Sequence, residues 1–229
     1  MTRAEAPPDR AGPSASTRRV AVPLAVWAAS YAAYRFYYAF GGQVGMVGQP
    51  SPALHFRHDN FIGGAIILLA ALLPSIAVSA WRHRSVPRLV PVVGWIAAVG
   101  CCMHAVTLMT LRVLSLTGVH PTHYPAGLWL TIDRREADLQ DLLFNEPWFF
   151  IEGCLWARFA LTALRPPSRA PWRHSVVVAC AFAAAVGVLS GLGAIPTFVT
   201  GKTMVLRPDA TKRRSRRRSR RRRLLGPVT

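Results

Sequence analysis

Five long apolar runs constrain this chain more than any other feature. They cover residues 20–41, 61–81, 89–111, 147–164 and 175–199. Each is close to the roughly 20 residues that an α-helix needs to cross about 30 Å of hydrocarbon. A soluble core rarely holds five such runs, and here 52% of the residues are hydrophobic and only 17% are charged. The sequence therefore predicts an all-α fold, a polytopic transmembrane helical bundle with four to five spans.

Two polar segments flank the predicted bundle, which covers residues 20–199. Residues 1–19 are rich in Pro, Ala, Ser and Arg without an apolar period, so we predict a disordered N-terminal extension and no cleavable signal peptide. Residues 200–229 are predicted to be a disordered Arg-rich tail. Gly187, Gly191, Gly193 and Pro196 interrupt the fifth run, so a full crossing and a broken helix both stay open.

Arginines in the short connections predict the orientation of the bundle. The N-terminal extension and the second and fourth connections hold ten of them: Arg3, Arg10, Arg18, Arg19, Arg82, Arg84, Arg88, Arg165, Arg169 and Arg173. The first and third connections hold only Arg57, Arg112, Arg134 and Arg135. Basic residues in short loops are retained on the cytoplasmic side. We therefore predict a multi-pass protein of the cell inner (plasma) membrane with a cytoplasmic N-terminus.

Charged residues within the runs are costly unless they pair, reach the surface or line water. Arg158 lies close enough to the cytoplasmic surface to extend its side chain into it. Arg35 and Glu152 lie at matching depth, roughly 8 to 9 Å below the exterior end at 1.5 Å per residue, so we expect them to form an ion pair. The predicted polar cluster at the floor of an outward-facing vestibule comprises Arg35, Asp59, Asn60, His104 and Glu152. Asp59 and Asn60 would cap the second run. Such a network either fixes helix register or binds a substrate or ion.

Two histidine pairs lie in the predicted exterior connections. They are His55 with His58, and His120 with His123. Imidazoles at this spacing can bind zinc or copper, although ordinary polar loop residues look the same and no cysteine accompanies them. The sequence therefore predicts no metal site and no cofactor, with these four histidines as the candidate ligands if a metal is bound.

Several shorter patterns predict local structure. Residues 132–144 have the polarity of a short helix lying along the outer interface, and Asn145 is placed to cap the fourth run. Small residues recur every four positions at Gly94, Ala98 and Cys102, and at Ala183, Gly187 and Gly191. Such faces let helices approach closely and would allow a homo-oligomer in the bilayer.

The basic residues of the tail conflict with the predicted orientation of the bundle. The tail holds twelve basic residues: Lys202, Arg207, Lys212, Arg213, Arg214, Arg216, Arg217, Arg218, Arg220, Arg221, Arg222 and Arg223. Five crossings would place all of them outside the cell, against the usual bias. The cluster either attaches to anionic lipid or has no selected role, and nucleic acid is disfavoured because no aromatic residues interleave it.

Two motifs carry a resemblance to known proteins. The segment RFYYAFGGQVGMVG at residues 35–48 and the segment DLLFNEPWFFIEG at residues 141–153 resemble a family of uncharacterised small multi-pass membrane proteins of actinobacteria. That family usually has an aromatic residue before a similar Gly-Gly turn. The resemblance covers about residues 20–164 and implies a four-helix core, without implying a reaction.

No nucleophile with a neighbouring base, dinucleotide-binding loop or cofactor motif is recognisable, so the sequence favours a protein that is not an enzyme. We predict a structural or accessory membrane protein held by the Arg35–Glu152 pair. Two alternatives stay open. One is a small transporter or ligand-binding protein that uses the outward-facing vestibule, and the other is a metal-dependent membrane enzyme that uses the four histidines.

Overall fold

The computed structural model describes residues 12–51, 53–122, 124 and 128–195. Within these ranges the chain has five long helices: α1 (Ala15–Ala39), α2 (Ala53–Ser79), α3 (Val86–Leu116), α5 (Glu146–Ala163) and α6 (Pro166–Gly191). A short helix α4 (Arg134–Gln140) runs into the π-helical segment η2 (Asp141–Asn145), which continues into α5. Strands β1 (Gly48–Pro50) and β2 (Trp129–Ile132) form a small antiparallel sheet. The predicted helical class is confirmed, with this two-stranded sheet as an unpredicted addition.

Among the described residues, three helices are long and apolar enough to cross a membrane. They are Leu54–Ser79, Val86–Leu116 and Pro166–Gly191. The other two long helices each carry three charged residues: Arg18, Arg19 and Arg35 in α1, and Glu146, Glu152 and Arg158 in α5. Large apolar side chains nevertheless stay exposed on all five, including Val26 of α1 and Phe150 of α5. A chain with this much exposed apolar surface is typical of a lipid environment.

The helices differ from the predicted runs mainly at their starts. Helix α1 begins at Ala15, inside the segment predicted to be disordered, because the Ser14 side chain accepts a hydrogen bond from the Thr17 N–H at 3.1 Å. Helix α2 begins at Ala53, so Asp59 and Asn60 lie within its second turn and the prediction that they cap it is wrong.

Helix α6 also begins earlier than the fifth run and ends sooner. Most of the fourth connection, expected between residues 164 and 175, is part of this helix. Pro166 is the first residue of α6 and Pro167 the second, where a missing N–H costs no hydrogen bond. Only Leu164 and Arg165 separate α5 from α6. The helix ends at Gly191, and Gly193 follows with a φ of 72°. The remainder of the run from residue 196, like the N-terminal residues 1–11 and the tail, lies outside the described residues.

Residues 132–144 do not form the single interfacial helix that we predicted. Ile132 ends β2, and α4 starts one residue later with Asp133 as its N-cap, accepting from the Glu136 N–H at 3.0 Å. Asn145 lies at the N-cap position of α5 as predicted, but its side chain makes no capping hydrogen bond, because η2 passes into α5 without a break. The sheet places Gly48 so close to Thr131 that a side chain at residue 48 would collide with the Thr131 carbonyl oxygen.

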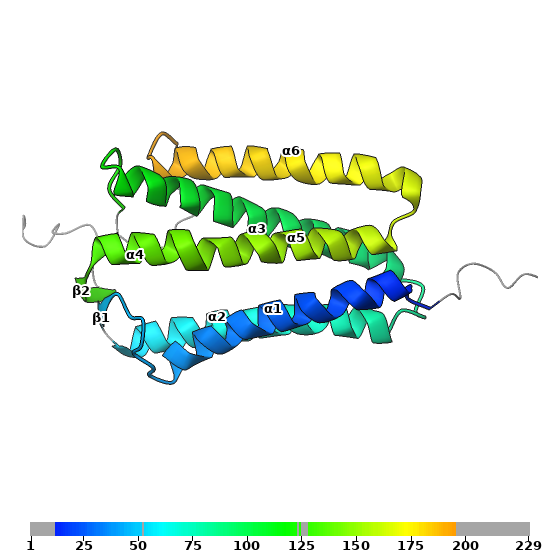
Figure 1. The fold of residues 1–229 in the computed structure, drawn as a ribbon, viewed down its shortest axis with the longest axis horizontal. Coiled ribbons are helices and arrows are strands. Elements are labelled where there is room, and N and C mark those ends of the chain that lie inside the picture. Colours follow the sequence, from blue (N-terminus) through cyan, green and yellow to red (C-terminus); the bar gives the residue numbers. More distant parts are fainter. Residues whose placement is uncertain (1–11, 52, 123, 125–127, 196–229) are drawn as a thin grey trace, which may run out of the picture. The chain divides into compact units, whose positions relative to one another are not determined.

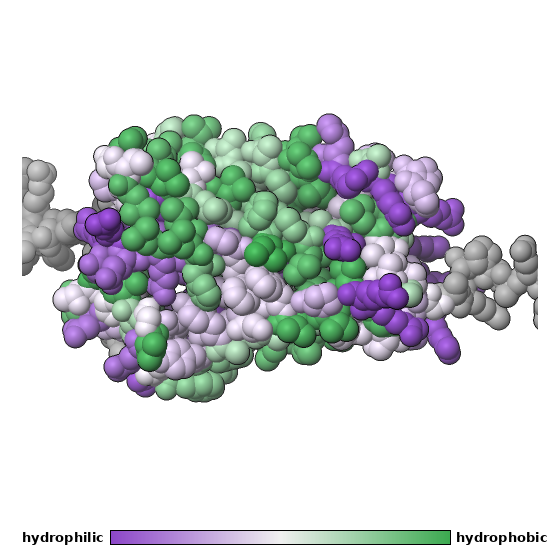
Figure 2. Space-filling view, in the orientation of Figure 1, coloured by the Kyte–Doolittle hydropathy of each residue, from purple (hydrophilic) through white to green (hydrophobic). Residues whose placement is uncertain are grey.

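The long helices lie side by side, with α1 against α2 and α5, and with α3 against α5 and α6 (Figure 1). The starts of α1, α3 and α6 and the ends of α2 and α5 share one end, on the right of Figure 1, which we call the arginine end. Its exposed arginines are Arg18, Arg19, Arg82, Arg84, Arg88, Arg165, Arg169 and Arg173. The sheet and α4 lie at the opposite end, which we call the acidic end. Figure 2 shows the most hydrophilic side chains gathered towards both ends.

Small residues on α3 and α6 face other helices of the same chain. A Cβ built on Gly94 would lie 2.6 Å from Ala160 Cβ of α5, and one on Gly187 would lie 2.5 Å from Thr107 Oγ1 of α3. Ala98 is fully buried. The close approach that we predicted for these stripes is therefore used inside the chain, and an oligomer through the same faces stays a prediction.

Gly94→Ala is expected to destabilise the bundle, whereas Gly100→Ala is expected to be neutral or to stabilise it by up to about 1 kcal/mol, because alanine favours a helix more than glycine does. Both glycines lie in α3, so the change in helix propensity is the same. Only residue 94 is crowded, since nothing lies within 4 Å of a Cβ at Gly100. Overpacking typically costs about 1–3 kcal/mol. Thermal unfolding of the two purified variants in one detergent measures the difference, and equal stabilities would contradict the close contact of α3 with α5.

Candidate functional site

Two adjoining cavities open at the acidic end of the helices. The larger, of about 430 Å³, is lined by Arg57 together with the α1–β1 loop, β1 and β2, and we call it the Arg57 cavity. The smaller, of about 170 Å³, is lined by Arg35 and lies between α1, α2, α4 and η2, and we call it the Arg35 cavity. They share Tyr38, Met46 and Phe56 as walls. These elements lie far apart in the sequence and meet only in the folded chain.

Arg35 is a half-buried cation without a carboxylate partner. Its side chain crosses from α1 to α2, where a Cβ on Gly63 would lie 3.1 Å from its Nη2 and 3.3 Å from its Nε. The absence of a side chain at Gly63 therefore makes room for the guanidinium. Among the described residues Arg35 makes no ion pair and no hydrogen bond. Partial burial of an unpaired cation costs free energy, and a bound anion would offset that cost.

Asn60 lies in the same cavity, one helical turn before Gly63. Its side chain is 3% exposed, and its Nδ2 donates to the Phe56 carbonyl at 2.8 Å. Its Oδ1 is buried and has no hydrogen-bond partner. Residues three apart share a helix face, so the unpaired acceptor of Asn60 and the unpaired guanidinium of Arg35 lie on one side of α2. The cavity thus presents one cation and one acceptor that no described residue satisfies.

Aromatic and amide groups fix the remaining walls of the Arg35 cavity. The Gln140 Nε2 of α4 donates to the Tyr34 hydroxyl at 3.3 Å and to the Gly45 carbonyl at 3.0 Å. The Tyr38 hydroxyl donates to the Val44 carbonyl at 3.0 Å. These bonds tie the α1–β1 loop to α1 and α4, so the loop is held in place by polar contacts at several points along its length.

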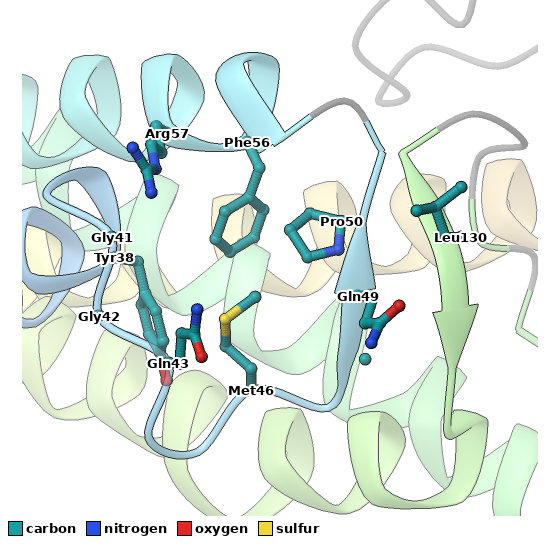
Figure 3. Close-up of a pocket in the computed structure, with 11 residues that line it drawn as sticks. Tyr38, Gly41, Gly42, Gln43, Met46, Gln49, Pro50, Phe56, Arg57 and Leu130 are labelled. Atoms are coloured by element: carbon teal, nitrogen blue, oxygen red, sulfur yellow. The ribbon is translucent and has the colours of Figure 1, made fainter.

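The Arg57 cavity adjoins the Arg35 cavity through their shared walls. Figure 3 shows the residues that line the Arg57 cavity. In this view the Phe56 ring and the Met46 side chain point into the space between α2 and the loop. The Arg57 guanidinium lies over Gly41, where a Cβ would lie 2.7 Å from Nη2 and where φ is 94°. Arg57 is exposed and, like Arg35, makes no ion pair with a described residue.

A network around Arg112 forms one side of the Arg35 cavity, which is lined by its members Tyr124, Asp141 and Asn145. Arg112 Nε of α3 donates to Asp141 Oδ2 of η2 at 2.9 Å, and Arg112 Nη2 lies 2.8 Å from the same oxygen. Its Nη1 donates to Thr122 Oγ1 at 3.0 Å and lies 3.5 Å from Asp138 Oδ1 of α4. The Arg112 side chain is 12% exposed and the Asp138 side chain 3%. Arg112 therefore joins α3 to α4 and η2 through largely desolvated ion pairs.

The two carboxylates accept further hydrogen bonds. Ser115 Oγ donates to Asp138 Oδ2 at 2.5 Å, and the Tyr124 hydroxyl donates to Asp138 Oδ1 at 2.9 Å. Burial raises the pKa of the Tyr124 phenol, which keeps it protonated as a donor. Asn145 Nδ2 donates to Asp141 Oδ1 at 2.7 Å. Because these acids are satisfied by their neighbours, the network is suited to holding the end of the bundle together.

The predicted polar cluster is divided between four places. The Arg35–Glu152 ion pair is not formed, because Arg35 extends to Gly63 of α2 while Glu152 lies on α5. The next residue, Gly153, packs on Cys102 of α3, with Glu152 4% exposed and its Oε2 unpaired. Of the five predicted residues, the structure brings only Arg35 and Asn60 into one cavity.

His104 and Asp59 have other neighbours. His104 Nε2 lies 3.6 Å from Glu146 Oε2, and its ring meets the Phe149 ring edge-on at 4.8 Å between centroids. Asp59 is exposed on α2, where its Oδ1 lies 3.6 Å from His58 Nδ1. Neither residue lines the Arg35 cavity.

The candidate metal ligands show no common site in the described ranges. His55 and His58 are exposed on α2, His120 follows α3, and His123 lies outside the described residues. No group of three or more His, Cys, Asp or Glu side chains within those ranges is arranged to hold a metal ion. The arginines predicted to bind an anionic partner, from Arg213 to Arg223, also lie outside them.

No protein-family model matches this chain, and no curated protein or solved structure matches it either. The resemblance to small multi-pass membrane proteins is thus carried by the two sequence motifs alone.

Proposed function

We propose that this chain is an integral membrane protein that binds a small anionic solute in the Arg35 cavity. All five long helices cross the bilayer in this proposal. Helices α2, α3 and α6 cross because they are apolar, and α1 and α5 cross because they pack along them. The arginine end faces the cytoplasm, in keeping with the retention of basic residues on that side, so the two cavities face outward.

The observation that carries the proposal is that one cation and one hydrogen-bond acceptor, each without a partner among the described residues, line the same cavity. In this cavity, no described residue supplies an anion to Arg35 or a donor to the Oδ1 of the buried Asn60. A carboxylate or phosphate matches the fork of a guanidinium, and a hydroxyl or amino group on the same ligand would donate to Asn60. The ligand class is therefore a small acid with a neighbouring donor, such as a hydroxycarboxylate or an amino acid.

Two alternatives are less well supported. A purely structural role was predicted from an Arg35–Glu152 pair, which is not formed. The Arg112 network can supply that structural role and leaves Arg35 uncommitted. A metal-dependent enzyme would need a set of ligands that the described residues do not bring together.

The test is calorimetric titration of the purified protein with lactate, propionate and inorganic phosphate, and with choline as a cation. Wild-type protein should bind the anions and not choline. Arg35→Gln should weaken anion binding roughly 10- to 150-fold, the equivalent of about 1.5–3 kcal/mol for hydrogen bonds to a charged group. Arg19→Gln, on the same helix at the arginine end, should bind like wild type. Equal binding by the two variants would overturn the proposal.

Asn60→Leu separates the two halves of the site. Wild-type protein should bind lactate more tightly than propionate, because only lactate has a hydroxyl for Asn60 Oδ1. In the Leu variant the two acids should bind alike. Circular dichroism and gel filtration establish that each variant is folded, and a lactate preference that survives in folded Asn60→Leu would remove Asn60 from the site.

A further inference from the structure

An apolar groove lies near the arginine end, far from the two cavities. It has a volume of about 180 Å³ and runs between the end of α2 and the start of α3, with α5 at its base. Its walls include Leu73, Ile76, Val86, Leu89, Trp156 and Phe159. Helices α2 and α3 follow each other in the chain but pack mainly on other helices, α2 on α1 and α3 on α5 and α6. The groove fills the space that this leaves between them.

Its apolar side chains are not covered by other parts of the described chain. Leu73 is 44% exposed, Ile76 54% and Leu89 54%. These residues belong to two of the helices that are apolar enough to cross a membrane. An unfilled apolar groove at that depth faces lipid tails, and an acyl chain is the occupant that matches its chemistry and its narrow volume.

Three arginines lie at the arginine end of the bundle, next to the groove. Arg82 and Arg84 are in the connection from α2 to α3, and Arg88 is in the first turn of α3, next to Leu89. All three are exposed, and none makes an ion pair with a described residue. The described acidic residues lie at the acidic end or, like Glu152, on the half of α5 nearest to it. No acidic residue in the described part of the chain therefore neutralises these three arginines, which leaves them available to an anionic partner.

We propose that the α2–α3 groove and these arginines form a binding site for one anionic phospholipid of the cytoplasmic leaflet. One acyl chain lies in the groove, and the headgroup phosphate contacts the guanidinium groups of Arg82, Arg84 and Arg88. Basic groups next to a membrane surface attract anionic lipids, and arginine matches phosphate geometry well. The assignment to the cytoplasmic leaflet rests on the proposed orientation of the bundle. The site itself is separate from the Arg35 cavity, so lipid binding and binding of a small anion can fail independently.

A second copy of the chain is a poorer occupant of the same groove. A two-fold dimer through this face would bring two sets of these arginines together, and like charges in contact are unfavourable. In a common membrane orientation the acidic residues of the second copy would lie at the opposite end, out of reach. Charge complementarity thus favours a phospholipid.

Native mass spectrometry of the purified full-length chain tests the site with phosphatidylglycerol and phosphatidylcholine of identical chains. Wild-type protein should retain one phosphatidylglycerol with roughly tenfold preference over phosphatidylcholine. The variant R82Q/R84Q/R88Q should lose that preference. The matched variant R165Q/R169Q/R173Q removes three exposed arginines from the same end but from the α5–α6 side, and should keep it. Both variants keep the tail, so any lipid bound there contributes equally.

Filling the groove gives a second, charge-neutral test. Val93→Trp places a large side chain in the groove wall without touching the arginines. It should abolish the single tightly retained lipid while leaving gel-filtration behaviour unchanged. Equal loss of preference in the two triple variants would show a general surface-charge effect and overturn the site. Retention of the lipid by folded Val93→Trp, or a dimer that the same change dissociates, would overturn the acyl-chain assignment.

Discussion

Arg112→Gln is expected to lower the free energy of unfolding by about 3–5 kcal/mol, the usual cost of removing one partner from a buried ion pair. The Asp138 carboxylate would stay buried without its ion-pair partner, and Asp141 would lose its ion pair with Arg112. For a chain of this size the loss corresponds to roughly 6–20 °C in melting temperature. Thermal unfolding in detergent, followed by far-ultraviolet circular dichroism, measures it.

Arg134→Gln is the matched control, because Arg134 is exposed in α4 and makes no ion pair with a described residue. It should change stability by less than about 0.5 kcal/mol. Adding Asp138→Asn and Asp141→Asn to Arg112→Gln should recover part of the loss, since no carboxylate would then be left unpaired. A stable Arg112→Gln variant, or a triple variant no better than the single one, would show that the network does not hold this end together.

The fold could be predicted from the sequence only where the hydrophobic pattern is strong. Each of the five long apolar runs contains most of one long helix, because nearly every residue within a run is compatible with lipid. The starts of α2 and α6 were missed because polar and proline residues there looked like loops. In the structure Asp59 and Asn60 continue α2, and Pro166 and Pro167 begin α6. The β1–β2 pair was missed because each strand is very short and the partners are about eighty residues apart.

The candidate site was predicted only in part. Depth along the helices correctly marked Arg35 and Asn60 as residues near one end, but depth does not determine which way a side chain points around its helix. That missing angle is why Arg35 meets Gly63 instead of Glu152. Arg112 was overlooked because it follows the predicted end of its run by one residue. Asp138 and Asp141, three apart on one helical face, were the available signal that a cation should lie opposite.

Reporter fusions at successive connections are expected to alternate completely between the two sides of the membrane. Fusions after Arg84 and after Leu164 should give cytoplasmic fluorescence and no exported phosphatase activity. Fusions after Gly118, after Ile195 and after Thr229 should give the reverse. The expected results for the four fusions other than the one after Thr229 follow from the positive charge of the arginine end and from five crossings of the membrane. The last tests whether the basic tail is exported despite its charge.

The sequence alone left open whether the fifth run crosses the membrane fully. The contacts of α6 with α3 supply a physical reason for a full crossing. At the arginine end Trp172 Nε1 of α6 donates to the Pro91 carbonyl of α3 at 3.2 Å. At the other end Gly191 of α6 packs against Leu111 of α3. Helix α6 therefore accompanies α3 along its length, and it is itself apolar enough to cross.

If α3 crosses the bilayer, α6 must cross with it or lose these contacts. A result in which Leu164 and Ile195 fusions both lie inside would mean that α6 leaves α3 in the membrane, and the four-helix core alone would span. A result with every reporter reversed would turn the Arg35 cavity to the cytoplasm and the arginine end outward. The anionic-lipid site would then have to draw on the outer leaflet, where the electrostatic attraction that favours it is weaker.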